Sequence, residues 1–301
     1  MTALARSAAA SLPKPVFDEL LWDDSVRLLA FGKPYDWSLR LFQGNTSKSE
    51  LEDLASSLYL PKIALECDMG KFIYAPSPRL FNAEVCTETE TMPLRVEVSS
   101  KLFQNTIWLY RGKDADGLVL SRGNTYVVSA AGCPILLLKD RATGILGVAH
   151  AGLRSIFDEG KLKGERARKH ESVVFSLSQA LARQGVQSFA AVEAFIAFSI
   201  DPQDFTFPWD HPQFGELNKK RTEYLVERWG REAIANYDNQ KRRQLGRPDL
   251  AAILKSQCVS LGIRPKNIKV LDSPPKRVWH DTRQGGNPLA RNLIFVQHLR
   301  T

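Results

Sequence analysis

The stretch from Gly132 to Ser155, GCPILLLKDRATGILGVAHAGLRS, is the part of the sequence that decides the fold. It contains two apolar runs, Ile135–Leu138 and Ile145–His150, separated by a polar segment that ends in Gly144. Apolar runs on both sides of a short polar segment with a glycine are typical of a β-hairpin. We therefore expect two antiparallel strands in this stretch.

The register of this hairpin determines which side chains meet across it. Pairing Leu138 with Ile145 leaves a six-residue loop, Lys139–Gly144, and places Cys133 directly opposite His150. Directly opposite residues have Cβ atoms roughly 5 Å apart, whereas a shift by one residue would send them to opposite faces. In this register the thiol and the imidazole reach each other or one metal ion. Otherwise they are a buried cysteine and an unrelated histidine.

The residues next to this pair favour a binding site. Pro134 limits strand pairing, which indicates that the strand begins there. Gly152 allows the backbone to turn or to approach a ligand closely. The guanidinium of Arg154 can bind a phosphate or a carboxylate through two hydrogen bonds. Cys133 and His150 are therefore candidate catalytic residues or metal ligands, with Arg154 beside them.

The composition is that of an ordinary globular protein, because 44% of the 301 residues are hydrophobic and 25% are charged. No apolar run approaches the roughly 20 residues of a membrane-spanning helix, so we expect no membrane association. The net charge is +8, but aromatic residues are not interleaved with the basic clusters as a base-stacking surface requires. We therefore expect no specific binding of nucleic acid.

The cysteines and the N-terminus bear on compartment and organisation. None of the four cysteines forms a CxxC motif, and Arg6 interrupts the apolar stretch that a secretory signal would need. We expect a cytoplasmic protein whose thiols are core residues, metal ligands or nucleophiles. The chain shows neither repeats nor a long linker, so it divides into a flexible tail, residues 1–15, and a single domain, residues 16–301.

The rest of the sequence mixes helical and strand patterns without a regular alternation. This mixture favours the α+β class over a doubly wound sheet. Asp249 is well placed to cap the helix that follows it, and Gly262 ends that helix. Further helices are expected at 47–58, 170–184 and 214–236, and strands at 126–138, 145–150, 190–200, 268–271 and 292–298, with several short strands between 62 and 115.

The residues around Cys133 resemble the YfiH-like laccase-domain family, also called multicopper polyphenol oxidase or peptidoglycan editing factor proteins. That family has a cysteine–proline strand followed by His-Ala-Gly-Trp-Arg-Gly, and the similar stretches here are Ala130–Pro134 and His150–Ser155. Other similar stretches follow in the family's order: Pro34–Leu41, Ala115–Leu118, Ile196–Phe207, Asp249–Ile263, Val278–Arg283 and Ala290–Asn292. The ordered set makes a chance match improbable.

This resemblance implies a layered α/β/β/α sandwich, similar also to the catalytic domain of the cytotoxic necrotizing factor toxins. It implies a pocket in which a cysteine and two histidines bind zinc. Family members are associated with phosphorolysis of adenosine, inosine, guanosine or methylthioadenosine and with adenosine deamination, so the expected partners are a nucleoside and phosphate. The laccase name implies a four-copper oxidase, but the five histidines of this chain are too few for such a centre.

The sequence departs from the family at the metal site. The family's first metal-binding histidine precedes the cysteine, whereas this chain has no histidine before His150. Cys67, Asp68 or His280 would have to supply the third zinc ligand, or else the site is incomplete. In a nucleoside-processing enzyme, Cys133, His150 and Arg154 are the expected catalytic residues, and Arg40, Arg283 and His280 are the expected substrate-binding residues.

Three functions remain open from the sequence. The first is a divergent purine nucleoside-processing enzyme with an altered zinc site. The second is a metal-free hydrolase or transferase, in which His150 activates Cys133 as a nucleophile. The third is a binding protein that has lost catalysis and acts only through a partner.

Overall fold

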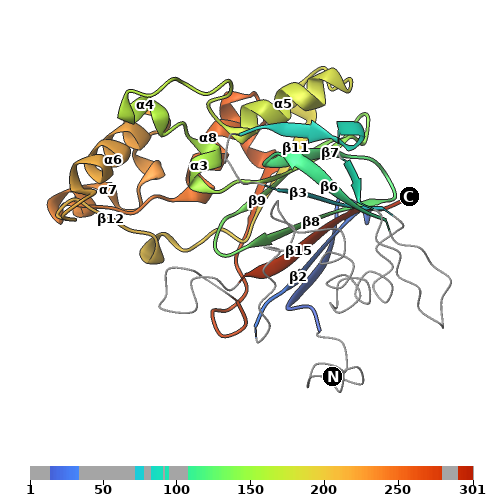
Figure 1. Cartoon of the computed structure of the whole chain (residues 1–301), viewed down its shortest axis with the longest axis horizontal. Helices are drawn as coiled ribbons and strands as arrows, with labels where there is room; N and C mark the ends of the chain where they lie inside the picture. Colours follow the sequence, from blue (N-terminus) through green and yellow to red (C-terminus); the bar gives the residue numbers. More distant parts are fainter. Residues whose placement is uncertain are drawn as a thin grey trace.

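Two facing β-sheets and a group of helices form the part of the chain that the structure describes (Figure 1). The structure is a computed structural model that describes residues 14–33, 72–77, 83–90, 92–94, 108–279 and 291–300. The expected helix at 47–58 lies outside these residues. The expected short strands between 62 and 115 are confirmed where they fall within the described residues.

The larger sheet has seven strands in the order β1-β2-β15-β8-β3-β6-β5. Their bounds are β1 Phe17–Leu21, β2 Val26–Phe31, β15 Asn292–His298, β8 Asn124–Ala130, β3 Phe72–Ser77, β6 Trp108–Asp114 and β5 Met92–Leu94. The second sheet has six strands in the order β14-β11-β9-β10-β7-β4. Their bounds are β14 Ile268–Leu271, β11 Val192–Ala197, β9 Ile135–Asp140, β10 Leu146–His150, β7 Gly117–Leu120 and β4 Val85–Thr87.

The helices cover the six-stranded sheet and extend beyond one end of it (Figure 1). They are α3 Leu153–Ile156, α4 Gly160–Lys163, α5 Val173–Arg183, α6 Gly215–Trp229, α7 Tyr237–Arg242 and α8 Leu250–Ser260. Short 3-10 helices are η3 Glu88–Glu90, η4 Phe189–Ala191, η5 Pro202–Asp204, η6 Arg231–Ala233 and η7 Pro265–Asn267, and β12 Phe207–Pro208 pairs with β13 Leu245–Gly246. The longest described helix, α6, has 15 residues, and no described helix has the length and apolar content needed to cross a bilayer.

Strand β9 shows why the sheets and helices form layers. Ile135 and Leu137 pack in the core between the two sheets, whereas Leu136 and Leu138 pack in a second core with α5 and α8. Because both faces of β9 are buried, its sequence is a continuous apolar run instead of an alternating one. The described residues thus contain sheet, sheet and helix layers, and the expected α+β class is confirmed.

The expected hairpin is present, but its register was predicted wrongly by two residues. His150 pairs with Ile135, so the connecting loop has four residues, 141–144. The tighter loop is stabilised by Asp140, whose carboxylate accepts hydrogen bonds from the Thr143 amide at 2.9 Å and hydroxyl at 2.7 Å. Gly144 closes the loop at a φ of +71°, which few other residues adopt. A shift by two residues keeps each side chain on its predicted face.

The expected strand at 126–138 is in fact two strands in different sheets. β8 ends at Ala130 in the seven-stranded sheet, and β9 begins at Ile135 in the six-stranded sheet. The link between them turns at Gly132, whose φ is +86°. Because a positive φ suits glycine and because Pro134 cannot donate to a strand ladder, the chain leaves one sheet and enters the other here. Cys133 lies on this link.

The observed helix boundaries differ from the predicted ones mainly where a cap residue begins or ends the helix earlier or later than expected. α5 begins after Ser172, whose hydroxyl accepts a hydrogen bond from the Val174 amide, and not at residue 170. α6 ends at Trp229, before Gly230 with its φ of +89°, so the predicted helix 214–236 was too long. α8 follows the prediction, because the Asp249 carboxylate accepts a hydrogen bond of 2.9 Å from the Ala252 amide.

Candidate functional site

Cys133 and His150 lie beside each other at the edge of the core between the sheets. Cys133 packs against this core from the β8–β9 link, and His150 is the last residue of β10. Gly152 contacts both: a Cβ added to it would lie 3.1 Å from the Cys133 sulfur and 3.1 Å from Cε1 of His150. In the observed register Cys133 therefore faces Gly152 instead of lying directly opposite His150. The predicted direct pairing was wrong, but the predicted proximity of the two side chains is observed.

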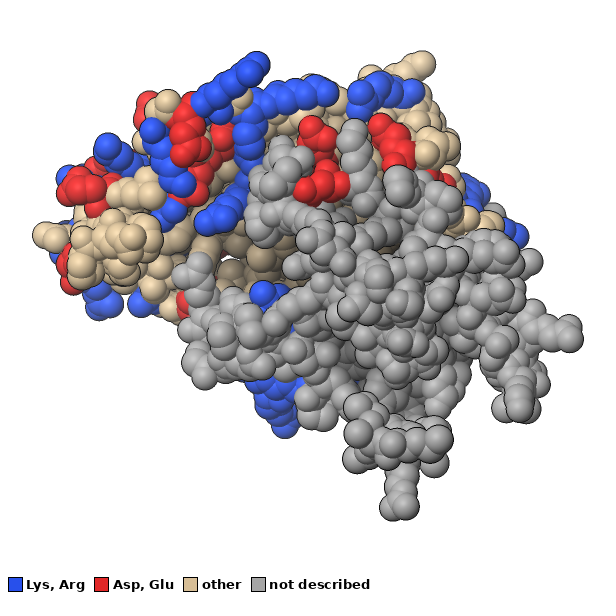
Figure 2. Space-filling view, viewed as in Figure 1, with Lys and Arg blue, Asp and Glu red and all other residues tan. Residues whose placement is uncertain are grey.

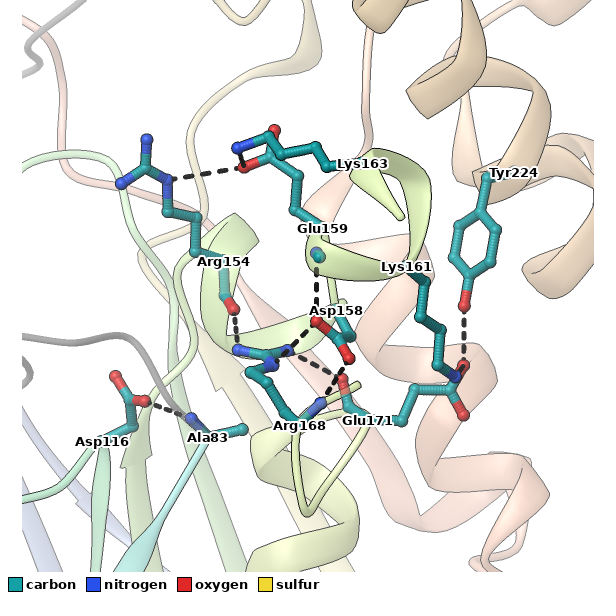
Figure 3. Close-up of polar contacts among 11 residues, drawn as sticks. Ala83, Asp116, Arg154, Asp158, Glu159, Lys161, Lys163, Arg168, Glu171 and Tyr224 are labelled. Atoms are coloured by element: carbon teal, nitrogen blue, oxygen red, sulfur yellow. Dashed lines mark hydrogen bonds and ion pairs between the residues drawn. The ribbon is translucent and has the colours of Figure 1, made fainter. Parts of the chain in front are cut away.

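A buried carboxylate, Asp116, lies behind His150. Its Oδ1 atom is 3.8 Å from Nδ1 of the imidazole and accepts a 2.7 Å hydrogen bond from the Ser155 hydroxyl. Its Oδ2 atom accepts a 2.8 Å hydrogen bond from the Ala83 amide (Figure 3). The main-chain amide of His150 also donates to the Asp116 carbonyl at 2.8 Å. These contacts orient the ring so that Nδ1 faces Asp116 and Nε2 lies on the side of Gly152.

The environment of His150 favours the protonated ring. Burial by itself lowers the pKa of this imidazole, but the negative charges of Cys133 and Asp116 outweigh burial and raise the pKa to about 10. His150 is only 4% exposed, so water screens these charges weakly. The two neighbouring groups, Cys133 and Asp116, thus favour the protonated form of the imidazole that lies between them.

A cavity of about 340 Å³ opens next to this centre. Cys133 and Gly152 line one part of it, and a polar wall consists of Arg154, Glu159 and Arg221. The apolar part of the lining consists of Ile200, Phe205, Phe207 and Leu250. The rings of Phe205 and Phe207 contact each other edge to face, with centroids 5.3 Å apart. The cavity therefore has the size and the mixed lining of a small-molecule site.

The structure brings together three of the sequence-predicted residues. Cys133 and Arg154 line the same cavity, and His150 lies behind Gly152 at its edge. The side chain of Arg154 is 66% exposed, and its Nε atom lies 3.9 Å from the Glu159 carboxylate (Figure 3). The other predicted residues, Arg40, Cys67, Asp68, His280 and Arg283, lie outside the described residues.

Sequence reasoning missed four residues of the site: Asp116, Ser155, Glu159 and Arg221. Asp116 belongs to the Ala-Asp-Gly-Leu stretch that marked the family resemblance, and Ser155 ends the stretch that begins with His150. Both therefore had a sequence signal but no assigned role. Arg221 is on α6, far from Cys133 in the sequence, and only the tertiary structure places it on the cavity wall.

The donor set at this centre fits zinc in kind but not in number among the described residues. A thiol and an imidazole are zinc ligands, and the carboxylate behind His150 is the usual second partner of a zinc-bound histidine. The described residues contain no group of three histidine, cysteine or acidic side chains arranged around one ion. A complete site would need a ligand from the rest of the chain, where Cys67 and His280 lie.

Comparisons with known proteins agree with this architecture. Three solved structures share the fold over more than nine-tenths of each chain. YfiH from Bacillus licheniformis is 14% identical, with a TM-score of 0.58 over 91% of this chain and 93% of its own. YlmD from Geobacillus stearothermophilus is 13% identical, with a TM-score of 0.59 over 92% and 93%. A DUF152 protein from Neisseria meningitidis is 13% identical, with a TM-score of 0.53 over 94% and 99%.

Sequence comparison identifies the family. No functionally curated protein matches the chain. Residues 82–274, which include the whole cavity wall described above, match the family described as multi-copper polyphenol oxidoreductase laccase. This match covers well over half of the chain and contains Asp116, Cys133 and His150. The expected family is confirmed: the chain belongs to the multi-copper polyphenol oxidoreductase laccase family and has the YfiH-like fold.

Proposed function

We propose that this protein is an enzyme that processes purine nucleosides, by phosphorolysis or by adenosine deamination, with Cys133 and His150 at the reaction centre. One observation carries the proposal: the oriented Cys133–His150–Asp116 group adjoins a cavity of about 340 Å³ with an aromatic and a cationic wall. A planar base suits the aromatic wall, and phosphate suits the cationic wall. Membership of the YfiH-like family supports the same substrates.

In phosphorolysis, a phosphate oxygen attacks C1′ of the ribose, and the bond from C1′ to the purine nitrogen breaks. The bond electrons leave with the purine, which must gain a proton. We assign that proton to Nε2 of His150, because the raised pKa keeps the ring protonated and Asp116 holds it in place. Arg154 holds the attacking phosphate, since it is the exposed cation on the wall next to Cys133.

In the alternative, deamination, zinc would be held by Cys133 and a deprotonated His150, with a third ligand from outside the described residues, so this form excludes the proton transfer assigned to His150 in phosphorolysis. When bound, such an ion activates water, which is the nucleophile that deamination requires. Four-copper oxidase chemistry is not proposed, because five histidines cannot build that centre.

The test is turnover by the purified full-length protein. Adenosine, inosine and methylthioadenosine are each incubated with and without phosphate and zinc, and products are separated by chromatography. Free base with ribose 1-phosphate indicates phosphorolysis, and inosine from adenosine indicates deamination. C133A and H150A serve as negative controls. The absence of product in every mixture would overturn the proposal.

A second candidate function rests on Asp116. A carboxylate that orients a histidine beside a cysteine is the arrangement of a Cys–His–Asp hydrolase or transferase, in which the thiolate attacks a carbonyl. This function predicts that iodoacetamide modifies Cys133 selectively near neutral pH. Cys86 and Cys258 are internal controls, because both thiols are buried and burial raises the pKa of Cys258 to about 12. Equal modification of all three would exclude an activated nucleophile.

A further inference from the structure

One carboxylate on the cavity wall, Glu159, is surrounded by cations. It lies 3.9 Å from Nε of Arg154 and 3.5 Å from Nζ of Lys163, and it forms an ion pair with Arg221. The Glu159 side chain is only 11% exposed, although it belongs to a short surface segment. Three cations therefore share one anion at the wall of the cavity, which leaves an excess of positive charge there.

Arg221 is held in place independently of Glu159. Its NH1 group donates a 2.7 Å hydrogen bond to Asn218 on the same helix, and its guanidinium carbon lies 5.3 Å from the centroid of the Phe207 ring. Its side chain is 15% exposed. Because these contacts fix the guanidinium before any ligand arrives, it can exchange one carboxylate for another anion without reorganising.

The segment that carries Glu159 is anchored by its neighbour. Asp158 is buried and accepts hydrogen bonds from the Gly160 amide at 3.1 Å and the Arg168 amide at 2.8 Å (Figure 3). Arg168 in turn donates a 2.5 Å hydrogen bond to the Arg154 carbonyl. The backbone around Glu159 is therefore fixed, while its carboxylate is held by ion pairs that another anion can replace.

The positive wall continues outside the cavity. A neighbouring hollow of about 220 Å³ shares Arg154 and Glu159 with it. This hollow adds three cations, Lys163, Arg166 and Arg168, and two carboxylates, Asp158 and Glu165. Figure 2 shows Lys and Arg side chains mixed with Asp and Glu over the end of the molecule that carries α4, α6 and α7 in Figure 1.

We propose that the carboxylate of Glu159 is a built-in counter-ion. It occupies the position beside Arg154 and Arg221 that the anionic group of a ligand would take, here called the oxyanion subsite. A ligand enters by displacing this carboxylate from the two arginines. The ligand class is a small molecule with a carboxylate or phosphate group and an apolar or aromatic part against Phe205 and Phe207. This inference takes one element from the proposed function, namely that the ligand binds beside Cys133. It adds the residue that competes with the ligand and thereby sets how strongly anions bind.

The rate at which Cys133 is alkylated depends on the charge of the subsite, so this rate can be used to measure that charge. Iodoacetate and iodoacetamide alkylate the same thiolate, but only iodoacetate is an anion, so the ratio of their rates cancels the thiolate fraction. Rates at Cys133 are measured by peptide mass spectrometry on the full chain with a chelator present, and glutathione supplies the reference ratio. We expect a ratio above that of glutathione that falls as salt is added.

Substitutions then locate the effect. E159Q keeps the shape of the side chain but removes the negative counter-ion. It should therefore raise the ratio of the iodoacetate rate to the iodoacetamide rate by about threefold or more, whereas R154Q should lower this ratio by a similar factor. E193Q is the matched control, because Glu193 is a similarly covered carboxylate, 14% exposed, paired with Arg141 at the other end of the six-stranded sheet. An unchanged ratio in E159Q and R154Q would overturn the inference.

Two further measurements keep the inference independent of thiol reactivity and of turnover. The rise in Tm with phosphate should be larger for E159Q than for the wild type, and equal rises would count against the inference. Protection of Cys133 by phenyl phosphate or by benzoate distinguishes a phosphate from a carboxylate ligand, and protection by neither would also overturn it. Nucleoside turnover without these charge effects refutes this inference alone, and charge effects without turnover refute only the proposed function.

Discussion

The site has two polar walls that differ in how they are built: one lies behind Gly152 at the edge of the cavity, and the other lines the cavity itself. On one wall, Asp116 is fully buried, His150 is 4% exposed, and hydrogen bonds from Ser155 and Ala83 fix the carboxylate. On the other wall the contacts are ion pairs, and the side chain of Arg154 is 66% exposed. The first wall is part of the core, whereas the second combines the exposed Arg154 with the more covered Glu159 and Arg221. Under the proposed function, the first wall would set the chemistry and the second would select the ligand.

Substitutions on the two walls should have different effects, because a lost buried polar contact costs more free energy than a lost exposed ion pair. A buried polar group left without its partner costs about 1–3 kcal/mol, and a buried charge costs more. An exposed ion pair contributes about 0–1 kcal/mol, because water and salt screen it. Substitutions on the buried wall should therefore affect both folding and catalysis, whereas those on the exposed wall should affect binding alone. The following predictions test this contrast, beginning with the largest effect.

Loss of the reacting side chains should have the largest effect. We expect C133A and H150A each to lower kcat/KM for the best nucleoside by about a thousandfold, because positioned acid–base groups and nucleophiles contribute effects of that size. C133A should keep its Tm near that of the wild type, since Cys133 is only partly buried. Steady-state kinetics and thermal unfolding check both statements. Retained turnover in C133A would show that the reaction centre does not include Cys133.

Removal of the buried carboxylate should destabilise the fold. D116A leaves the Ser155 hydroxyl and the Ala83 amide without their acceptor, so we expect a loss of about 3 kcal/mol in the free energy of unfolding. R154Q on the exposed wall should cost about 0.5 kcal/mol or less. Urea denaturation of both variants gives the comparison. Similar losses in the two would mean that the walls do not differ as described.

A single methyl group at Gly152 should separate catalysis from folding. Its φ of −63° suits alanine, but the added Cβ would lie 3.1 Å from both the Cys133 sulfur and Cε1 of His150. The pair must then shift by a few tenths of an ångström, and we expect kcat to fall about tenfold with little change in KM. Kinetics and Tm of G152A test this, and an unchanged kcat would show that the spacing of the pair is not critical.

The smallest expected effect is a pH-dependent change in stability that comes from Glu171. Glu171 accepts a hydrogen bond from the Tyr224 hydroxyl at 2.8 Å (Figure 3). It also accepts a hydrogen bond from Arg228 at 3.1 Å. The hydrogen bond from Arg228 lowers the pKa of Glu171 below its ordinary value of 4.5, although burial opposes this. The lowered pKa means that the stabilisation is present above pH 4.5 and is lost as pH falls through the folded-state pKa.

We therefore expect E171Q to be less stable than the wild type at pH 7 by under about 1 kcal/mol, since the pair is partly exposed. The difference should shrink as the pH falls below 4.5. Urea denaturation at several pH values measures it. A difference that stays constant over this range would show that the carboxylate charge does not contribute.

Several parts of the fold and site followed from local sequence patterns. The apolar runs around Gly144 predicted the β9–β10 hairpin, and Asp249 predicted the start of α8. The register was missed because the contacts of Asp140 with Thr143 tighten the loop. The proximity of Cys133 and His150 survived that error, because a shift by two residues preserves the face of a strand.

The Cys–His pair and its face were thus determined by the sequence itself, since alternation along a strand and a glycine turn act over a few residues. Only the tertiary structure decided that the chain changes sheets at Gly132, that Asp116 lies behind His150, and that Arg221 and Glu159 share the cavity wall. These contacts join residues distant in sequence, and they form because each strand and helix must bury its apolar face against another layer. Local patterns placed the Cys133–His150 pair, and the packing of layers supplies what surrounds it.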